Sequence, residues 1–161
     1  MNARSLTLGV VVFVLLILQY TVRPILDWRA GIDFLIIALL VLAVRVRPGA
    51  AAASGFLIGL VADALTPAAF GAGALAMTLV GFAGSRLKAG FFAENLWLNA
   101  VFVFVGKVLF DLVYLLAEQR LGGAALLTQL FVWTPLAALV TSLVGLLVMA
   151  MVRPTLERRQ R

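Results

Sequence analysis

The stretch from Pro48 to Ser85 constrains this chain most, because Asp63 is its only ionisable side chain. The rest of the stretch consists mainly of Ala, Gly, Leu, Val and Phe. Such a stretch is too apolar for a water-exposed surface, and it is longer than the roughly 20 residues that one membrane-spanning helix needs. We therefore predict a helical hairpin in lipid, with Asp63 near its tip. A carboxylate in that position is costly unless a nearby group compensates its charge.

The composition of the whole chain also indicates that lipid is its main solvent. Of 161 residues, 64% are hydrophobic and 12% are charged, whereas about a quarter of the residues in a soluble domain are charged. The chain has no Cys and no His, which excludes disulfides and thiolate chemistry and removes the commonest general base. In a membrane protein the net charge of +6 reports orientation rather than a nucleic-acid partner, so we expect no nucleic acid to bind.

Hydropathy predicts a single all-α domain over residues 1–161, a polytopic bundle of six transmembrane helices. The first apolar segment follows a short start that contains Arg4, and we expect it to remain as an uncleaved span. The second segment has only eleven residues, so a short span and a re-entrant helix both remain open. The predicted segments are 6–22, 34–44, 50–65, 70–85, 96–117 and 126–152, the last with Pro135 inside it, and a basic tail follows at 153–161.

The distribution of basic residues predicts the orientation of this bundle. With six spans, both termini lie on one side, where nine of the 13 Lys and Arg residues fall, against three on the other side. Basic residues concentrate on the cytoplasmic side of a membrane, so we predict a multi-pass protein with both termini in the cytoplasm. The basic tail is also suited to contact anionic membrane lipids.

Small residues on the third predicted helix indicate a helix-packing face. Ala51, Gly55 and Gly59 recur every four residues, and Asp63 continues the series. Residues at this spacing share one face of a helix, and a Gly-x-x-x-Gly pair allows a second helix to approach closely. We therefore expect Asp63 to point toward protein rather than lipid.

The fifth predicted helix carries the other embedded charges, Lys107 and Asp111. Their four-residue spacing allows an ion pair across one turn. Each charge near the centre of a span costs about 2.5–3.5 kcal/mol, so a use for both is expected. From their depths we predict one polar cluster of Asp63, Lys107 and Asp111 in the outer half of the bundle, with Asp33 at its rim. Three interpretations stay open for it: a structural ion-pair network, a binding or partner-docking site, and a path for protons or ions.

A family resemblance is carried by residues 33–88. Asp33 directly precedes a short predicted helix rich in Leu and Ile, and the sequence Arg-x-Arg-Pro follows at 45–48. Residues 55–63 then have the form Gly-Phe-x-x-Gly-Leu-x-x-Asp, residues 70–75 the form Phe-Gly-x-Gly-Ala-Leu, and residues 79–84 the form Leu-Val-Gly-Phe-x-Gly. This order of motifs resembles the MreD family of rod shape-determining membrane proteins. The chain departs from the family at Ile32, where proline is common, and at Ala74, where a polar residue is common.

The resemblance implies a non-enzymatic scaffold of the elongation machinery in the bacterial inner membrane. It implies binding to MreC and, through the complex, association with MreB, RodA and a class B penicillin-binding protein. Such a protein supports rod shape and lateral peptidoglycan synthesis and uses no cofactor or metal. The resemblance also implies a fold similar to the substrate-binding subunits of energy-coupling factor transporters.

Two other functions are considered beside this one. The first is a small-molecule-binding subunit of an energy-coupling factor-type vitamin transporter, with the outer polar cluster as its ligand pocket. The first predicted helix lacks the Ala-x-x-x-Ala pattern through which such subunits usually dock. The second is a membrane enzyme of lipid-linked phosphate transfer, but three separated acids do not resemble the dense acidic sets that hold divalent metals in such enzymes.

Overall fold

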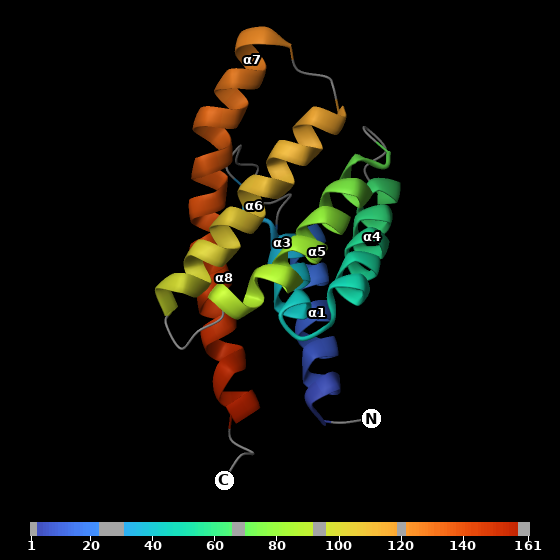
Figure 1. The fold of residues 1–161 in the computed structure, drawn as a ribbon, viewed down its shortest axis with the longest axis vertical. Helices are drawn as coiled ribbons and strands as arrows, with labels where there is room; N and C mark the ends of the chain where they lie inside the picture. The colour runs from blue at the N-terminus through green and yellow to red at the C-terminus, as the bar shows by residue number, and fades with distance from the viewer. Residues whose placement is uncertain (1–2, 23–30, 66–69, 92–95, 119–121, 158–161) are drawn as a thin grey trace.

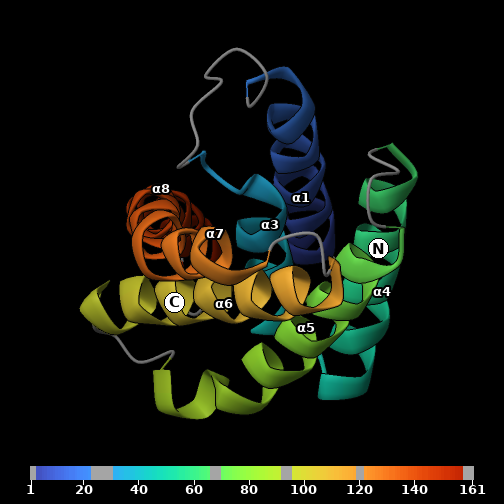
Figure 2. The same ribbon diagram turned by 90° about the horizontal axis from the view of Figure 1, so that it is seen from above.

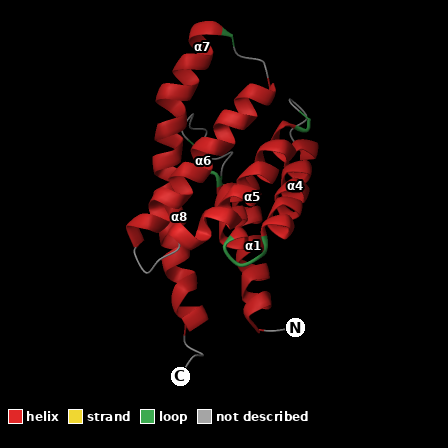
Figure 3. Ribbon diagram, viewed as in Figure 1, coloured by secondary structure: helices red, strands yellow, loops and turns green. Residues whose placement is uncertain are grey.

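The computed structural model describes residues 3–22, 31–65, 70–91, 96–118 and 122–157, and every regular element within these ranges is a helix (Figures 1 and 3). The prediction of an all-α fold is therefore confirmed for the described residues. Parts of the predicted connections between helices, at 23–30, 66–69, 92–95 and 119–121, lie outside these ranges, as does the end of the basic tail at 158–161. The helices are α1 (Ala3–Thr21), α3 (Phe34–Ala43), α4 (Pro48–Leu65), α5 (Ala72–Phe91), α6 (Leu96–Glu118), α7 (Gly123–Thr128), the π-helix η2 (Gln129–Trp133) and α8 (Thr134–Glu157).

Two helix ends differ from the predicted segments for simple reasons. Helix α4 begins at Pro48, where the fixed φ of proline suits the first turn and its missing N–H is not needed. Helix α5 continues to Phe91, beyond the predicted end at Ser85. Charged residues such as Arg86 and Lys88 end an apolar segment, but they do not interrupt a helix.

The last helix passes through Pro135 without a break. The elements α7, η2 and α8 follow one another directly from Gly123 to Glu157. In η2 the N–H of Thr134 bonds to the carbonyl of Gln129, five residues earlier. Proline lacks an N–H and its ring crowds the carbonyl four residues earlier, so a wider π-turn next to it relieves this conflict.

Helix α3 lies in the middle of the bundle (Figure 2). It contacts α1, α4, α5, α6 and α8, and nine of its ten residues are buried. An apolar helix without a polar face suits a position that is enclosed on all sides. At 1.5 Å per residue α3 is about 15 Å long, which is half of a hydrocarbon core of about 30 Å.

Four of the remaining helices pack around α3 as two close pairs. Helix α4 packs most extensively on α5, and α6 packs on α8. The start of α1 and the end of α8 lie at the same end of the molecule (Figure 1). Helix α7 lies at the opposite end.

Several described helices are apolar enough for a membrane. Three helical stretches have the length and hydropathy to cross a bilayer, namely Pro48–Leu65, Trp97–Glu118 and Gly123–Met151. Two shorter helical stretches, Gly9–Thr21 and Phe34–Ala43, are also apolar. The chain thus has the helices of a membrane protein.

Candidate functional site

The N-terminus of α3 is held by side chains from two other helices and by its own N-cap. The N–H of Asp33 donates to the Thr141 hydroxyl of α8 at 3.2 Å, and the N–H of Phe34 donates to Gln19 Oε1 of α1 at 2.9 Å. The Asp33 carboxylate accepts the N–H of Ile36 at 3.4 Å as an N-cap. The first N–H groups of a helix have no partner within it, so buried helix ends need such contacts. These bonds fix where α3 begins.

The ammonium of Lys107 links α3 to α6. Its Nζ lies 3.1 Å from Asp33 Oδ2 and 2.6 Å from Asp111 Oδ1. The exposed fractions of the three side chains are 7%, 6% and 16%, so the network is almost fully withdrawn from the surface. The predicted pair of Lys107 and Asp111 is present, and Asp33, which was expected at the rim, is a direct partner. A buried charge that lacks its partner is strongly destabilising, so these three residues depend on one another.

Asp63 is not part of this network, which corrects the prediction of one cluster containing it. Its Oδ2 accepts the N–H groups of Gly71 at 2.9 Å and Ala74 at 3.0 Å, and its Oδ1 accepts the N–H of Gly73 at 3.2 Å. These are the open N–H groups at the start of α5, where the positive end of the helix dipole also favours an anion. A Cβ at Gly73 would overlap Asp63 Oδ1, so glycine is needed there. The compensating group is therefore a helix terminus and not a lysine.

The small-residue face of α4 packs against α5. Ala51 is fully buried, and a Cβ added at Gly59 would lie 2.5 Å from the Cα of Ala74. A Cβ at Gly55 would overlap the carbonyl of Met77. The two backbones therefore touch along this face, which leaves no room on it for a helix from a partner protein.

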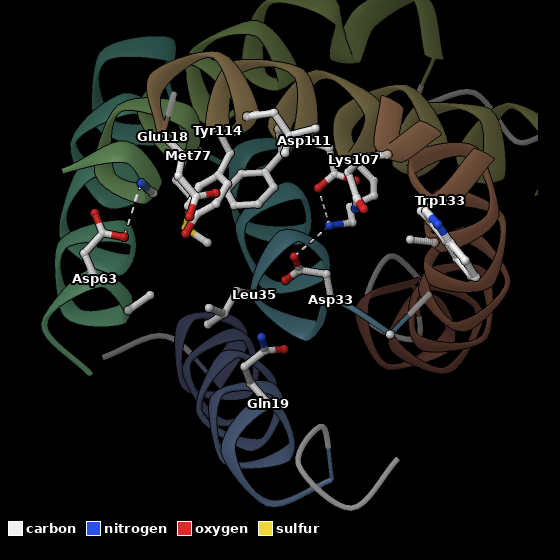
Figure 4. A pocket seen from close by; sticks show the side chains of 17 residues that line it. Gln19, Asp33, Leu35, Asp63, Met77, Lys107, Asp111, Tyr114, Glu118 and Trp133 are labelled. Carbon is white, nitrogen blue, oxygen red and sulfur yellow. Dashed lines mark hydrogen bonds and ion pairs between the residues drawn. The ribbon is translucent and has the colours of Figure 1, made fainter. Parts of the chain in front are cut away.

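A cavity of about 340 Å³ brings the predicted site residues together although they do not form one cluster (Figure 4). Asp33, Asp63, Lys107 and Asp111 all line it. Small-molecule sites generally occupy about 300–1,000 Å³, so this volume is within the range of a binding site. The other polar or aromatic residues that line it are Gln19, Phe110, Tyr114, Glu118, Gln129 and Trp133.

Sequence reasoning missed several of these residues. Gln19 and Thr141 are buried polar residues in apolar segments, the same signal that identified Asp63. Tyr114 and Trp133 lie near the ends of predicted spans and suit interfacial anchors, but they line the cavity. The sequence-based choice of site residues relied on charge, so these four uncharged residues were not among the candidates.

Comparison with known proteins does not identify the chain, since no family model, curated protein or solved structure matches it. In the described ranges, no group of three or more Asp and Glu side chains is arranged to hold a metal ion. The function is therefore inferred from the contacts of the embedded residues and from the cavity.

Proposed function

We propose that the chain is an MreD-like, non-enzymatic scaffold of the bacterial inner membrane. It would cross the membrane six times with both termini in the cytoplasm, as the sequence predicts. Its direct partner would be MreC, and MreB, RodA and a class B penicillin-binding protein would associate through the complex. Rod shape and lateral peptidoglycan synthesis would depend on this assembly.

The observation that carries the proposal is the set of contacts that the motif residues make between helices. Gly59 and Gly73 let α4 and α5 touch, and Asp63 bonds the end of α4 to the start of α5. Asp33, which opens the motif segment, joins α3 to α6 through Lys107. These contacts hold helices in fixed positions, which is what a docking platform requires. Roles of this kind favour a scaffold over turnover of a substrate.

The outer face of the α4–α5 pair is the surface we propose for the partner helix. The inner face of α4 is covered by α5, so a partner helix must use the opposite face. There Phe56, Leu57 and Val61 are 48%, 61% and 58% exposed, and Leu79 and Phe82 of α5 are also exposed. A face built on two locked helices offers a rigid surface, and helix association in lipid depends on close van der Waals packing.

The proposal is tested by co-purification of MreC from the same organism with the tagged chain. Ala53 is exposed on α4, and Ala150 is exposed on α8 and serves as a matched control. A tryptophan is tolerated by lipid but disturbs a helix–helix contact, so Ala53→Trp should lower MreC recovery about tenfold, roughly 1.4 kcal/mol. Ala150→Trp should leave recovery unchanged. Failure of the unmodified chain to retain MreC would refute the function, and equal recovery with both variants would refute only the surface.

Charge reversal at the embedded acids gives a second test. Asp63→Lys would place a cation against the N–H groups of α5, and Asp111→Lys would place it beside Lys107. Both changes should shift the platform and reduce MreC recovery while the chain still inserts. Unchanged recovery would contradict the proposed link between the embedded charges and docking.

The cavity favours a second candidate function, a vitamin-binding subunit of an energy-coupling factor-type transporter. Its volume and its mixture of polar and aromatic residues suit a small molecule. In this case the tagged chain should co-purify with ATP-binding subunits instead of MreC, and a vitamin should raise its thermal stability by mass action.

A further inference from the structure

The side chains around the cavity carry an excess of negative charge. Among the described residues that line it are three carboxylates, those of Asp33, Asp63 and Asp111, and one ammonium, that of Lys107. Three negative charges against one positive give this described part of the lining a formal charge of −2. Charge of one sign in a cleft with low-dielectric walls concentrates the opposite charge. The cavity therefore favours a cation over an anion.

An unpaired amide donor indicates a second feature of the occupant. Gln19 is 3% exposed, and its Oε1 accepts the N–H of Phe34 at 2.9 Å. Its Nε2 has no hydrogen-bond partner among the described residues, and Figure 4 shows this amide end directed toward the cavity. The side-chain amide of Gln129 also lines the cavity without a partner in the described part of the chain. An unpaired donor on a buried residue is costly, so the Gln19 amide favours a molecule with an oxygen acceptor, and the partly buried Gln129 offers a second donor.

Aromatic rings form another part of the wall. Phe110 and Tyr114 are stacked with their ring centroids 5.6 Å apart, and Trp133 lines the cavity beside α8. The ammonium of Lys107 lies 5.1 Å from the centroid of Phe110. The protein thus already holds one ammonium against an aromatic face here, and such faces attract cations. The π-turn η2, a feature frequent at functional sites, carries both Gln129 and Trp133.

From these three features we infer that the cavity binds a small organic ammonium that carries a neighbouring oxygen acceptor. The carboxylates and rings bind the ammonium, and the two amides donate to the oxygen. Two sources share this chemistry: a free amine, and the ethanolamine headgroup of a phospholipid. The inference does not rest on the proposed binding of MreC.

The test uses the full chain in nanodiscs of phosphatidylglycerol. The probes are 2-amino-1-phenylethanol, an amine with a neighbouring hydroxyl oxygen, and its uncharged analogue 1-phenylethane-1,2-diol, called the amine and the alcohol below. Binding is measured by tryptophan fluorescence and by the midpoint of thermal unfolding. We expect the amine to bind at least tenfold more tightly than the alcohol and to raise the midpoint by mass action. Equal binding of the two probes, or binding of neither, would overturn the inference.

A second set of nanodiscs identifies the source of the ammonium. If phosphatidylethanolamine in the bilayer raises the midpoint and weakens amine binding about tenfold, the headgroup occupies the cavity. If amine binding is unchanged, a free amine is the ligand. Either result supports an ammonium site once the amine and the alcohol have been distinguished.

Single substitutions distinguish a role in ligand binding from a purely structural role. Asp111→Asn keeps an oxygen that accepts from Lys107 but removes one negative charge. It should therefore weaken binding of the amine about tenfold and leave binding of the alcohol unchanged. A purely structural role would alter both probes equally, and that outcome, or no change in either, would contradict the inference. Gln129→Leu should weaken both probes, whereas Thr128→Val, on the exposed side of the same turn, should weaken neither.

Discussion

Removing the Asp63 carboxylate should loosen α4 from α5. The carboxylate accepts three N–H groups at the start of α5, at 2.9, 3.2 and 3.0 Å. Two of the donors, Gly73 and Ala74, are buried. The third, Gly71, is only partly buried. Asp63→Ala therefore leaves two buried donors without a partner.

The expected loss follows from these donors. A buried, unpaired N–H costs about 1–3 kcal/mol, so Asp63→Ala should lower the free energy of unfolding by about 2–6 kcal/mol. Asp63→Asn keeps one oxygen that accepts from Gly71 and Ala74, but its amide NH₂ then faces the N–H of Gly73. With one donor unpaired, the asparagine variant should lose about 1–3 kcal/mol. The free energy of unfolding should therefore decrease in the order wild type, Asp63→Asn, Asp63→Ala.

The measurement is reversible unfolding in mixed detergent micelles, with steric trapping as an independent method. Ser54→Ala is the matched control on the same helix, because the Ser54 hydroxyl bonds to the Ala50 carbonyl within α4 at an exposed position. It should change stability by no more than about 0.5 kcal/mol. If Asp63→Ala were as mild as Ser54→Ala, the proposed role of the carboxylate as a clamp between the two helices would be wrong.

Other predictions concern packing, charge and topology. Gly59→Ala places a methyl group against the backbone of α5 and should cost about 1–3 kcal/mol of unfolding free energy. Gly9→Ala meets no atom within 4 Å and should cost nothing, so equal losses would contradict the close α4–α5 contact. Lys107→Met leaves one buried and one partly buried carboxylate without their cation and should cost about 3–5 kcal/mol in the same assay. Changing both carboxylates to amides as well should restore part of the loss, and no recovery would argue against the ion pairs. The chain has no Cys, so single cysteines at the exposed Gly49 and Gly122 report topology. In spheroplasts an impermeant maleimide should label Gly122→Cys and not Gly49→Cys, and the opposite pattern would reverse the orientation.

Much of the helical framework is predictable because it follows local patterns. The predicted segment at 34–44 differs by one residue from α3, since an N-capping acid precedes an uninterrupted apolar run. The four-residue spacing of Ala51, Gly55 and Gly59 also identified the face that α5 covers. Both inferences need only the periodicity of a helix.

The partners of the embedded charges were harder to predict. Asp33 and Lys107 are separated by 74 positions, and only the packing of α3 against α6 brings them together. Asp63 was expected near a lysine because a sequence displays side-chain charges but not the open N–H groups of a helix start. Its true partners are backbone groups at Gly71, Gly73 and Ala74, which no residue type reveals.

The central position of α3 has a consequence for biogenesis. The ribosome delivers this segment early, yet one of its walls is α8, which is synthesised after all the other described helices. Until then the N–H of Asp33 lacks the Thr141 hydroxyl that it bonds to in the finished protein. The surroundings of α3 are therefore complete only after α8 has been synthesised, and a nascent chain truncated before α8 should be a preferred substrate for membrane quality-control proteases.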